Sequence, residues 1–260
     1  MPNSTPEYLS VDGDRIAVRH RNGKTPGIVW LGGYRSDMLG TKAETLDQWA
    51  AEHGHAFTRH DYSGHGESGG AFADGTISRW LAQSLTVFRQ RTVGPQILVG
   101  SSMGAWIALR IVQELHKAGE GGARRRHAAS GAGARFHGRA DGAAAGRQPA
   151  PRSRGTRFFA EQSDYSPEPN IYTRALFEDG RANRVMVGLI DTHCPVHILQ
   201  GMADPDVPYE HALKLVEHLP ADDVTLSLVR DGDHRLSRPQ DLSMMVAALE
   251  GLVERAAERS

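Results

Sequence analysis

One serine of the chain stands in a sequence context that is typical of a catalytic nucleophile. Residues 100–104 read GSSMG with Ser102 in the central position; they follow the apolar run 97–99 and lead into the apolar stretch 105–109. A G-x-S-x-G motif between a predicted strand and a predicted helix is typical of a nucleophile elbow, in which flanking glycines let both elements approach closely. We therefore predict that Ser102 is a nucleophile. The alternative is a Gly/Ser turn without chemistry.

A serine hydroxyl is a weak nucleophile unless a base removes its proton, and the base needs an orienting carboxylate. Asp204 lies in a predicted turn after the strand-like run 196–199, and His234 follows the strand-like run 224–229. The chain order Ser, Asp, His is the order expected for an elbow of this kind. We predict Asp204 as the acid and His234 as the base. Asp206 is the competing acid, and either aspartate could instead serve only to form the turn.

Acyl transfer also requires hydrogen-bond donors for the negative charge that develops on the carbonyl oxygen. The backbone N–H of Met103 directly follows the predicted nucleophile and is one candidate. The backbone N–H of Tyr34 is the second, because two preceding glycines let the loop after the predicted strand 28–31 approach a substrate closely. The alternative is a tight Gly-Gly turn with no part in the reaction.

The elements that must position these residues alternate along the chain. An Asp-Gly turn near the start predicts a hairpin. Further strands are predicted at 28–31, 56–60, 97–99, 196–199 and 224–229. Helices are predicted at 41–51, 78–91, 103–115, 209–219 and from about 240. This alternation favours a mostly parallel sheet with helices on both faces. We expect a single α/β domain over 1–260, with a small cap over 158–193.

The composition is that of an ordinary globular protein. The 260 residues carry a formal net charge of -1, and the single Cys excludes a disulfide framework and a multi-Cys metal site. The sequence contains no run of 18 apolar residues and no evident secretory leader, so we expect a cytoplasmic protein without a membrane span. His60 and His65 border a Gly-rich loop, where they could line the pocket, although we expect solvated side chains.

Residues 119–157 differ from the rest of the chain. They contain 9 Gly, 10 Ala and 9 Arg, without any Ile, Leu, Val or Met. Three explanations are open: an out-of-frame reading of a GC-rich gene, a disordered basic insertion, or a nucleic-acid-binding arm. The segment has one aromatic residue, Phe136, and no repeat. This argues against the last explanation, and we expect no nucleic-acid partner.

Taken together, the motifs resemble the α/β-hydrolase superfamily and, within it, the subfamily of palmitoyl-protein thioesterases and acyl-glucuronide esterases. The resemblance covers about 10–116 and 158–255, and its more specific stretches read RSDM at 35–38 and GDHRLS at 232–237. It implies hydrolysis of small-molecule acyl esters or thioesters without a cofactor. It also implies that Ser102, Asp204 and His234 form a catalytic triad. No feature of the sequence points to a particular oligomeric state.

The unusual segment interrupts this resemblance. Hydrolases of this kind place an apolar strand between the nucleophile strand and the acid strand, and residues 119–157 offer no apolar run. We therefore expect that strand to be missing or irregular, which would leave a gap of about 4.8 Å between the catalytic partners. The alternative to an active serine hydrolase is a hydrolase-like chain that does not catalyse or does not fold. A peroxidase or an acyltransferase on the same scaffold is a lesser alternative.

Overall fold

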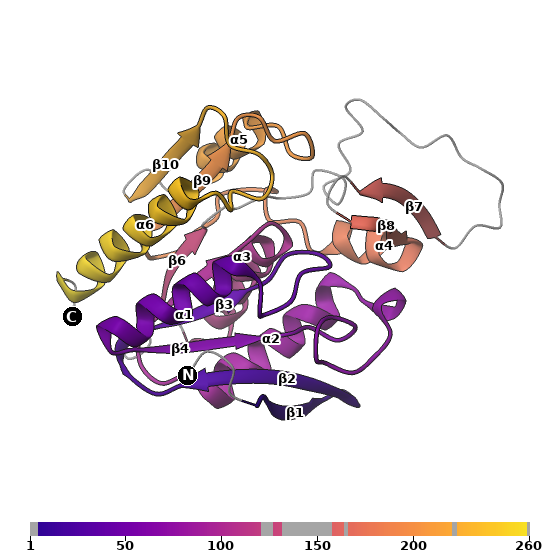
Figure 1. The fold of residues 1–260 in the computed structure, drawn as a ribbon, viewed down its shortest axis with the longest axis horizontal. Coiled ribbons are helices and arrows are strands. Elements are labelled where there is room, and N and C mark those ends of the chain that lie inside the picture. Colours follow the sequence, from indigo (N-terminus) through magenta and orange to yellow (C-terminus); the bar gives the residue numbers. More distant parts are fainter. Residues whose placement is uncertain (1–4, 121–126, 132–157, 164–165, 220–222, 259–260) are drawn as a thin grey trace.

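The computed structural model describes residues 5–120, 127–131, 158–163, 166–219 and 223–258. Its centre is an eight-stranded sheet in the order β1-β2-β4-β3-β5-β6-β9-β10 (Figure 1). The strands are β1 (Glu7–Val11), β2 (Asp14–Arg21), β3 (Lys24–Leu31), β4 (His55–His60), β5 (Gln96–Gly100), β6 (His127–Gly131), β9 (Val196–Gly201) and β10 (Val224–Val229). The β1–β2 and β2–β4 pairs are antiparallel, and all further pairs are parallel. The predicted N-terminal hairpin and mostly parallel sheet are confirmed.

Helices cover both faces of this sheet, as the alternation of apolar runs predicted. Strand β3 directs Ile28 and Trp30 to one face, and Val29 and Leu31 to the other, because successive side chains of a strand alternate. The first face packs against α1 (Thr41–His53) and α6 (Pro239–Glu258). The second face packs against α2 (Ile77–Arg91), α3 (Met103–Lys117) and α5 (Glu210–His218).

The expectation of a missing or irregular strand is wrong for residues 127–131. They form β6, which pairs in parallel with β5 through Gln96↔His127 and with β9 through Ala129↔Val196. Ladder hydrogen bonds come from the backbone, so a segment between two unpaired strand edges can join the sheet without an apolar run. Residues 121–126 and 132–157 lie outside the described residues. The three explanations of the unusual segment concern these residues and stay predictions.

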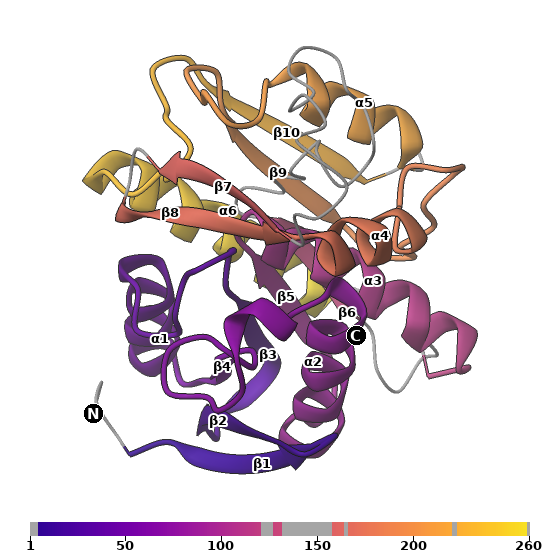
Figure 2. The same cartoon turned by 90° about the vertical axis from the view of Figure 1, so that its right-hand side faces the viewer.

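A smaller unit lies beside the main sheet, within the range predicted to form a cap (Figures 1 and 2). It contains the antiparallel strands β7 (Phe158–Ser163) and β8 (Ser166–Thr173), followed at once by α4 (Arg174–Ala182). Asp179 of α4 accepts hydrogen bonds from the backbone N–H and the hydroxyl of Ser78 at 2.8 and 2.6 Å, which join α4 to α2. The indole N–H of Trp106 donates to the carbonyl of Asn183 at 2.8 Å. We refer to β7, β8 and α4 as the β7–α4 unit.

The parallel strands determine where the predicted site residues lie. Because parallel strands end at the same edge of a sheet, the loops after β5, β9 and β10 emerge on one side. These three loops carry Ser102, Asp204 and His234, respectively. None of the helices that the structure describes is both long and apolar enough to cross a bilayer.

Candidate active site

The backbone of Ser102 has an uncommon conformation. Its φ is 54° and its ψ is -119°, and it stands immediately before α3 and just after β5. A non-glycine residue with positive φ carries strain that persists only where the surrounding structure holds it, and such residues cluster at functional sites. Ser102 is therefore held at the sharp strand–turn–helix junction that its motif predicts.

Two glycines make this junction possible. A Cβ atom added at Gly100 would lie 2.4 Å from the backbone nitrogen of Ala105, and one added at Gly104 would lie 2.0 Å from the carbonyl oxygen of Leu31. Both contacts involve backbone atoms, which cannot rotate away as a flexible side chain can. The first turn of α3 thus packs directly on β5 and on the end of β3 only because these positions lack side chains.

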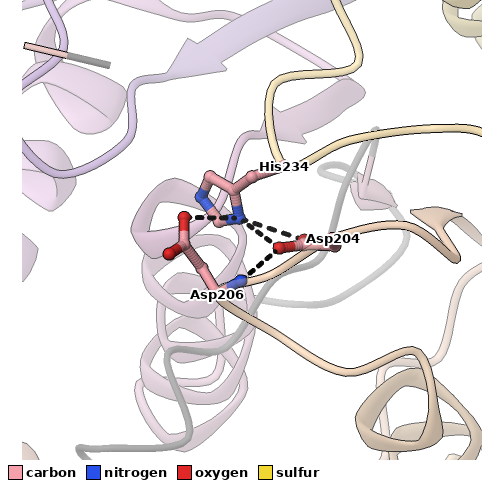
Figure 3. Close-up of side chains that lie close together, drawn as sticks. All are labelled: Asp204, Asp206 and His234. Atoms are coloured by element: carbon pink, nitrogen blue, oxygen red, sulfur yellow. Dashed lines mark hydrogen bonds and ion pairs between the residues drawn. The ribbon is translucent and has the colours of Figure 1, made fainter. Parts of the chain in front are cut away.

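The predicted acid and base are in contact. The Nδ1 atom of His234 lies 3.1 Å from Oδ1 and 3.0 Å from Oδ2 of Asp204 (Figure 3). The Asp204 side chain is fully buried, and that of His234 is 14% exposed. An ionised carboxylate can only accept hydrogen bonds, so this contact holds the proton of the neutral imidazole on Nδ1. Nε2 is then the ring nitrogen that can act as a base.

The surroundings of Asp204 fix its orientation. Its Oδ1 atom accepts hydrogen bonds from the backbone N–H groups of Asp206 and Val207 at 2.9 and 3.0 Å. Its Oδ2 atom accepts one from the side-chain amide of Gln200 at 3.3 Å. These donors, together with His234, occupy both carboxylate oxygens. The turn after β9 thus presents this carboxylate in one orientation to the imidazole.

Asp206 approaches the same imidazole from a different environment. Its Oδ2 atom lies 3.6 Å from Nδ1 of His234, and its side chain is 40% exposed (Figure 3). Asp204, Asp206 and His234 also offer ligand atoms within 4.8 Å of one another, as a metal site would. The donors that surround Asp204 favour its use as an orienting group for His234 instead. Its burial and shorter contacts also favour Asp204 over Asp206 as the acid.

The loop that carries Tyr34 passes beside Ser102, and Met103 directly follows Ser102. A Cβ atom added at Gly33 would lie 3.5 Å from the Cβ atom of Ser102, so the loop after β3 passes directly beside the serine. Within the described part of the chain, the backbone N–H groups of Tyr34 and Met103 donate no hydrogen bond. Unused N–H groups beside a strained serine are the arrangement that a developing oxyanion requires.

Comparison with known proteins agrees with this geometry. The sequence profile of the alpha/beta hydrolase family matches residues 27–244. The protein belongs to the alpha/beta hydrolase family. The predicted fold class is therefore confirmed, and Ser102 stands at the kind of strand–turn–helix junction that its motif predicts.

Individual relatives of this alpha/beta hydrolase include a named thioesterase. The chain is 30% identical over 252 residues to the palmitoyl-protein thioesterase ABHD10, mitochondrial, of Mus musculus, covering 92% of this chain and 79% of the relative. A crystal structure of a protein from Agrobacterium vitis S4 shares 52% identity with a TM-score of 0.88, covering 96% of this chain and all of that one. Alpha/beta hydrolase domain-containing protein 10 from mouse shares 26% identity with a TM-score of 0.83, covering 97% and 100%.

His65 supports the loop after β3, a role that its sequence context did not indicate. Its Nε2 atom accepts a hydrogen bond from the backbone N–H of Arg35 at 3.2 Å, and its Nδ1–H donates to the carbonyl of Ser63 at 3.2 Å. Burial lowers the pKa of His65 to about 4, which keeps the ring neutral and able to accept. His60 is also buried, so the expectation of two solvated histidines is wrong.

The loop after β3 also contacts the β7–α4 unit. The Tyr34 hydroxyl donates to the carbonyl of Ile171, and the Arg35 guanidinium donates to the carbonyl of Pro169. The ring of Tyr34 stacks on Tyr172 with centroids 5.1 Å apart and an interplanar angle of 8°. One dipeptide therefore connects the main sheet with β8. Sequence reasoning missed these contacts because they join residues more than 130 positions apart.

Proposed function

We propose that this alpha/beta hydrolase is a serine esterase or thioesterase that cleaves acyl substrates through an acyl-enzyme on Ser102. The observation that carries the proposal is the strained Ser102 on the sheet edge from which the Asp204–His234 pair also emerges. A nucleophile, a base and an orienting acid on three neighbouring loops are the parts that acyl transfer requires.

The reaction begins with proton transfer from Ser102. Nε2 of His234 takes the hydroxyl proton as Oγ attacks the acyl carbonyl carbon, and Asp204 stabilises the imidazolium through Nδ1–H. The Tyr34 and Met103 N–H groups bind the oxyanion of the tetrahedral intermediate. The bond to the leaving alkoxide or thiolate then breaks, and that group takes the proton from His234. Water attacks the acyl-enzyme with the same base, releasing the carboxylic acid and restoring Ser102.

The thioesterase part of the proposal is supported by the relative named palmitoyl-protein thioesterase. A substrate pair with the same acyl chain, one S-acyl and one O-acyl, separates the two activities. A kcat/KM higher for the S-acyl member supports a thioesterase, and the reverse ratio supports an esterase. Transfer of the acyl group to a nucleophile other than water, detected by product analysis, would instead support an acyltransferase.

The competing proposal is a hydrolase-like chain without catalysis. Its physical basis was a gap between the nucleophile strand and the acid strand. Strand β6 occupies that place, with Val99↔Ser130 and Ser130↔His197 pairing across it. An uninterrupted sheet from β5 to β10 favours the catalytic proposal, because the sheet is what keeps the loops of Ser102, Asp204 and His234 in register.

A fluorophosphonate probe tests the proposal directly, because it reacts with activated serines. We expect covalent labelling of the folded protein, with the adduct on the peptide that contains Ser102. Ser102→Ala abolishes labelling, whereas the control Ser243→Ala, at an exposed serine on α6, leaves it unchanged. Folded protein that the probe does not label, or labelling that survives Ser102→Ala, refutes the proposal.

A further inference from the structure

A lysine outside the predicted triad connects the elbow with the loop of His234. The ammonium group of Lys42 donates a hydrogen bond to Oγ of Ser101 at 2.6 Å and another to the carbonyl oxygen of Arg235 at 2.9 Å. Ser101 directly precedes Ser102, and Arg235 directly follows His234. A single cation thus bridges the two loops that must supply the nucleophile and the base.

The helix that carries Lys42 provides a rigid support. Lys42 is the second residue of α1, and its neighbour Ala43 and the next-turn residue Leu46 are fully buried against the sheet. The same helix begins shortly after the loop that follows β3. Because a side chain on a packed helix has a fixed origin, the ammonium can set the separation of the two loops that it contacts.

The loop of His234 is shaped by hydrogen bonds within it and is also held by Lys42 of α1. Within that loop, Oδ1 of Asp233 accepts the backbone N–H groups of Arg235 and Leu236 at 3.0 and 2.9 Å. These bonds shape the turn but do not connect it to the nucleophile. The bond from Lys42 to the Arg235 carbonyl makes that connection, and a hydrogen bond from a charged donor is stronger than one between neutral groups.

The position of Ser101 argues against a different use of the pair. A lysine can activate a serine as a neutral amine that accepts its proton, but the serine must then be the nucleophile. Ser101 is not the central residue of the elbow motif, whereas Ser102 is. The Ser101 hydroxyl therefore serves as an anchor for the ammonium.

We propose that Lys42 is a positioning residue that holds the Ser102 elbow and the His234 loop at the separation required for proton transfer. This inference rests on the proposed function, because it assigns the lysine a part in the same reaction. Displacement of a catalytic group by about 1 Å can reduce a rate by about 10²-fold, so one bridging cation can have a large effect without touching substrate.

The first test compares Lys42→Met, which keeps the aliphatic chain but removes the donors, with the control Lys117→Met. Lys117 is an exposed lysine on α3 whose contact is with Glu114 of the same helix. For p-nitrophenyl butyrate hydrolysis, normalised to folded protein, we expect Lys42→Met to lower kcat about tenfold or more with KM within about twofold. Lys117→Met keeps both constants, and Lys42→Arg recovers part of the lost kcat because it retains a cationic donor.

The second test is a double-mutant cycle with Ser101→Ala, which removes the anchor at the other end of the contact. If the ammonium acts through Ser101, the double variant loses little more kcat than Lys42→Met alone, because the coupled effects are not additive. Independent losses that multiply would overturn the assigned contact. A kcat of Lys42→Met within twofold of wild type, or a loss that follows only the unfolded fraction, would overturn the proposal itself.

Amide hydrogen exchange gives a readout that needs no activity. In Lys42→Met, we expect faster exchange in 231–237 than in wild type, with α3 unchanged. Equal exchange in both proteins contradicts the bridging role. Failure of the proposed function would be recognised separately, because wild-type protein would then show neither probe labelling nor hydrolysis. Active wild type with an equally active Lys42→Met refutes the role of the lysine alone.

Discussion

Two aspartates within reach of one histidine differ in what surrounds them. Asp204 is fully buried and accepts two backbone N–H groups and a side-chain amide, whereas Asp206 is 40% exposed and lies 3.6 Å from the imidazole. A buried carboxylate in a fixed orientation can determine which imidazole nitrogen carries the proton. An exposed one is screened by water and contributes little.

We therefore predict that Asp204→Asn and Asp206→Asn separate these roles. Replacing the orienting acid of a Ser-His-Asp triad by its amide favours the wrong imidazole tautomer, so Asp204→Asn should lower kcat by about 10³- to 10⁴-fold. Asp206→Asn should lower kcat by less than about tenfold. Steady-state kinetics of the two isosteric variants checks this. Equal losses, or a larger loss for Asp206→Asn, would assign the acid to Asp206 instead.

At the level of single residues, local sequence predicts the candidate catalytic residues but not the residues that hold them in place. Ser102, Asp204 and His234 could be nominated because each lies in the loop after an apolar strand and because their order is typical. Lys42 and His65 could not be assigned roles, because the contact of Lys42 with Arg235 spans 193 positions and depends on how α1 packs. Only the folded chain brings such pairs together.

The elbow depends on the close approach of secondary-structure elements. Gly104 lies where the first turn of α3 crosses the end of β3, and Gly100 lies where β5 meets that turn. Tertiary packing, and not local conformation alone, requires these glycines. Gly251 offers the opposite case, because a Cβ atom added there on α6 would meet nothing within 4 Å.

These two glycines give a matched stability prediction. Gly104→Ala should lower the free energy of unfolding by more than about 3 kcal/mol, because its methyl group would collide with the Leu31 carbonyl. Gly251→Ala should raise it by about 0.5–1 kcal/mol, because alanine loses less conformational freedom in a helix. Urea unfolding at neutral pH measures both. A Gly104→Ala protein as stable as wild type would contradict the tight crossing.

Elements were predictable where their side chains carry a hydrophobic period. The helix over 103–115 and the strand over 97–99 closely match α3 and β5. Strand β6 was not predicted because its residues, HAASG, lack any apolar run, although backbone pairing does not require one. Strand β8 is not among the predicted strands because it contains two prolines, which disfavour interior strands but are tolerated in an edge pair.

In the described part of the chain, burial lowers the pKa values of several histidines, among them the buried residues His55, His60 and His65. Desolvation lowers the pKa values of His60 and His65 to about 4, against an ordinary value of 6.5. Between these values, the unfolded chain binds protons that the folded protein does not. The stability that the neutral histidines contribute is therefore complete above about pH 6.5 and is lost as the pH falls towards 4.

We predict that the free energy of unfolding falls between pH 6.5 and pH 4.5, by up to about 1.4 kcal/mol per pH unit for each histidine. Burial raises the pKa of Asp61, which opposes part of this slope. His65→Gln should reduce the slope, whereas the control His53→Gln, at an exposed position, should not. Urea unfolding across this pH range measures the slopes. The same slope in wild type and His65→Gln would contradict the prediction.

Tyr34 lies in the loop after β3, beside Ser102, and also contacts strand β8. Its backbone N–H is a proposed donor to the oxyanion, while its hydroxyl and ring contact Ile171 and Tyr172 of the β7–α4 unit. Any coupling free energy between oxyanion binding and these contacts must be reciprocal. If such coupling exists, a substitution that loosens the Tyr34–Tyr172 contact weakens oxyanion binding, and oxyanion binding strengthens that contact by the same free energy.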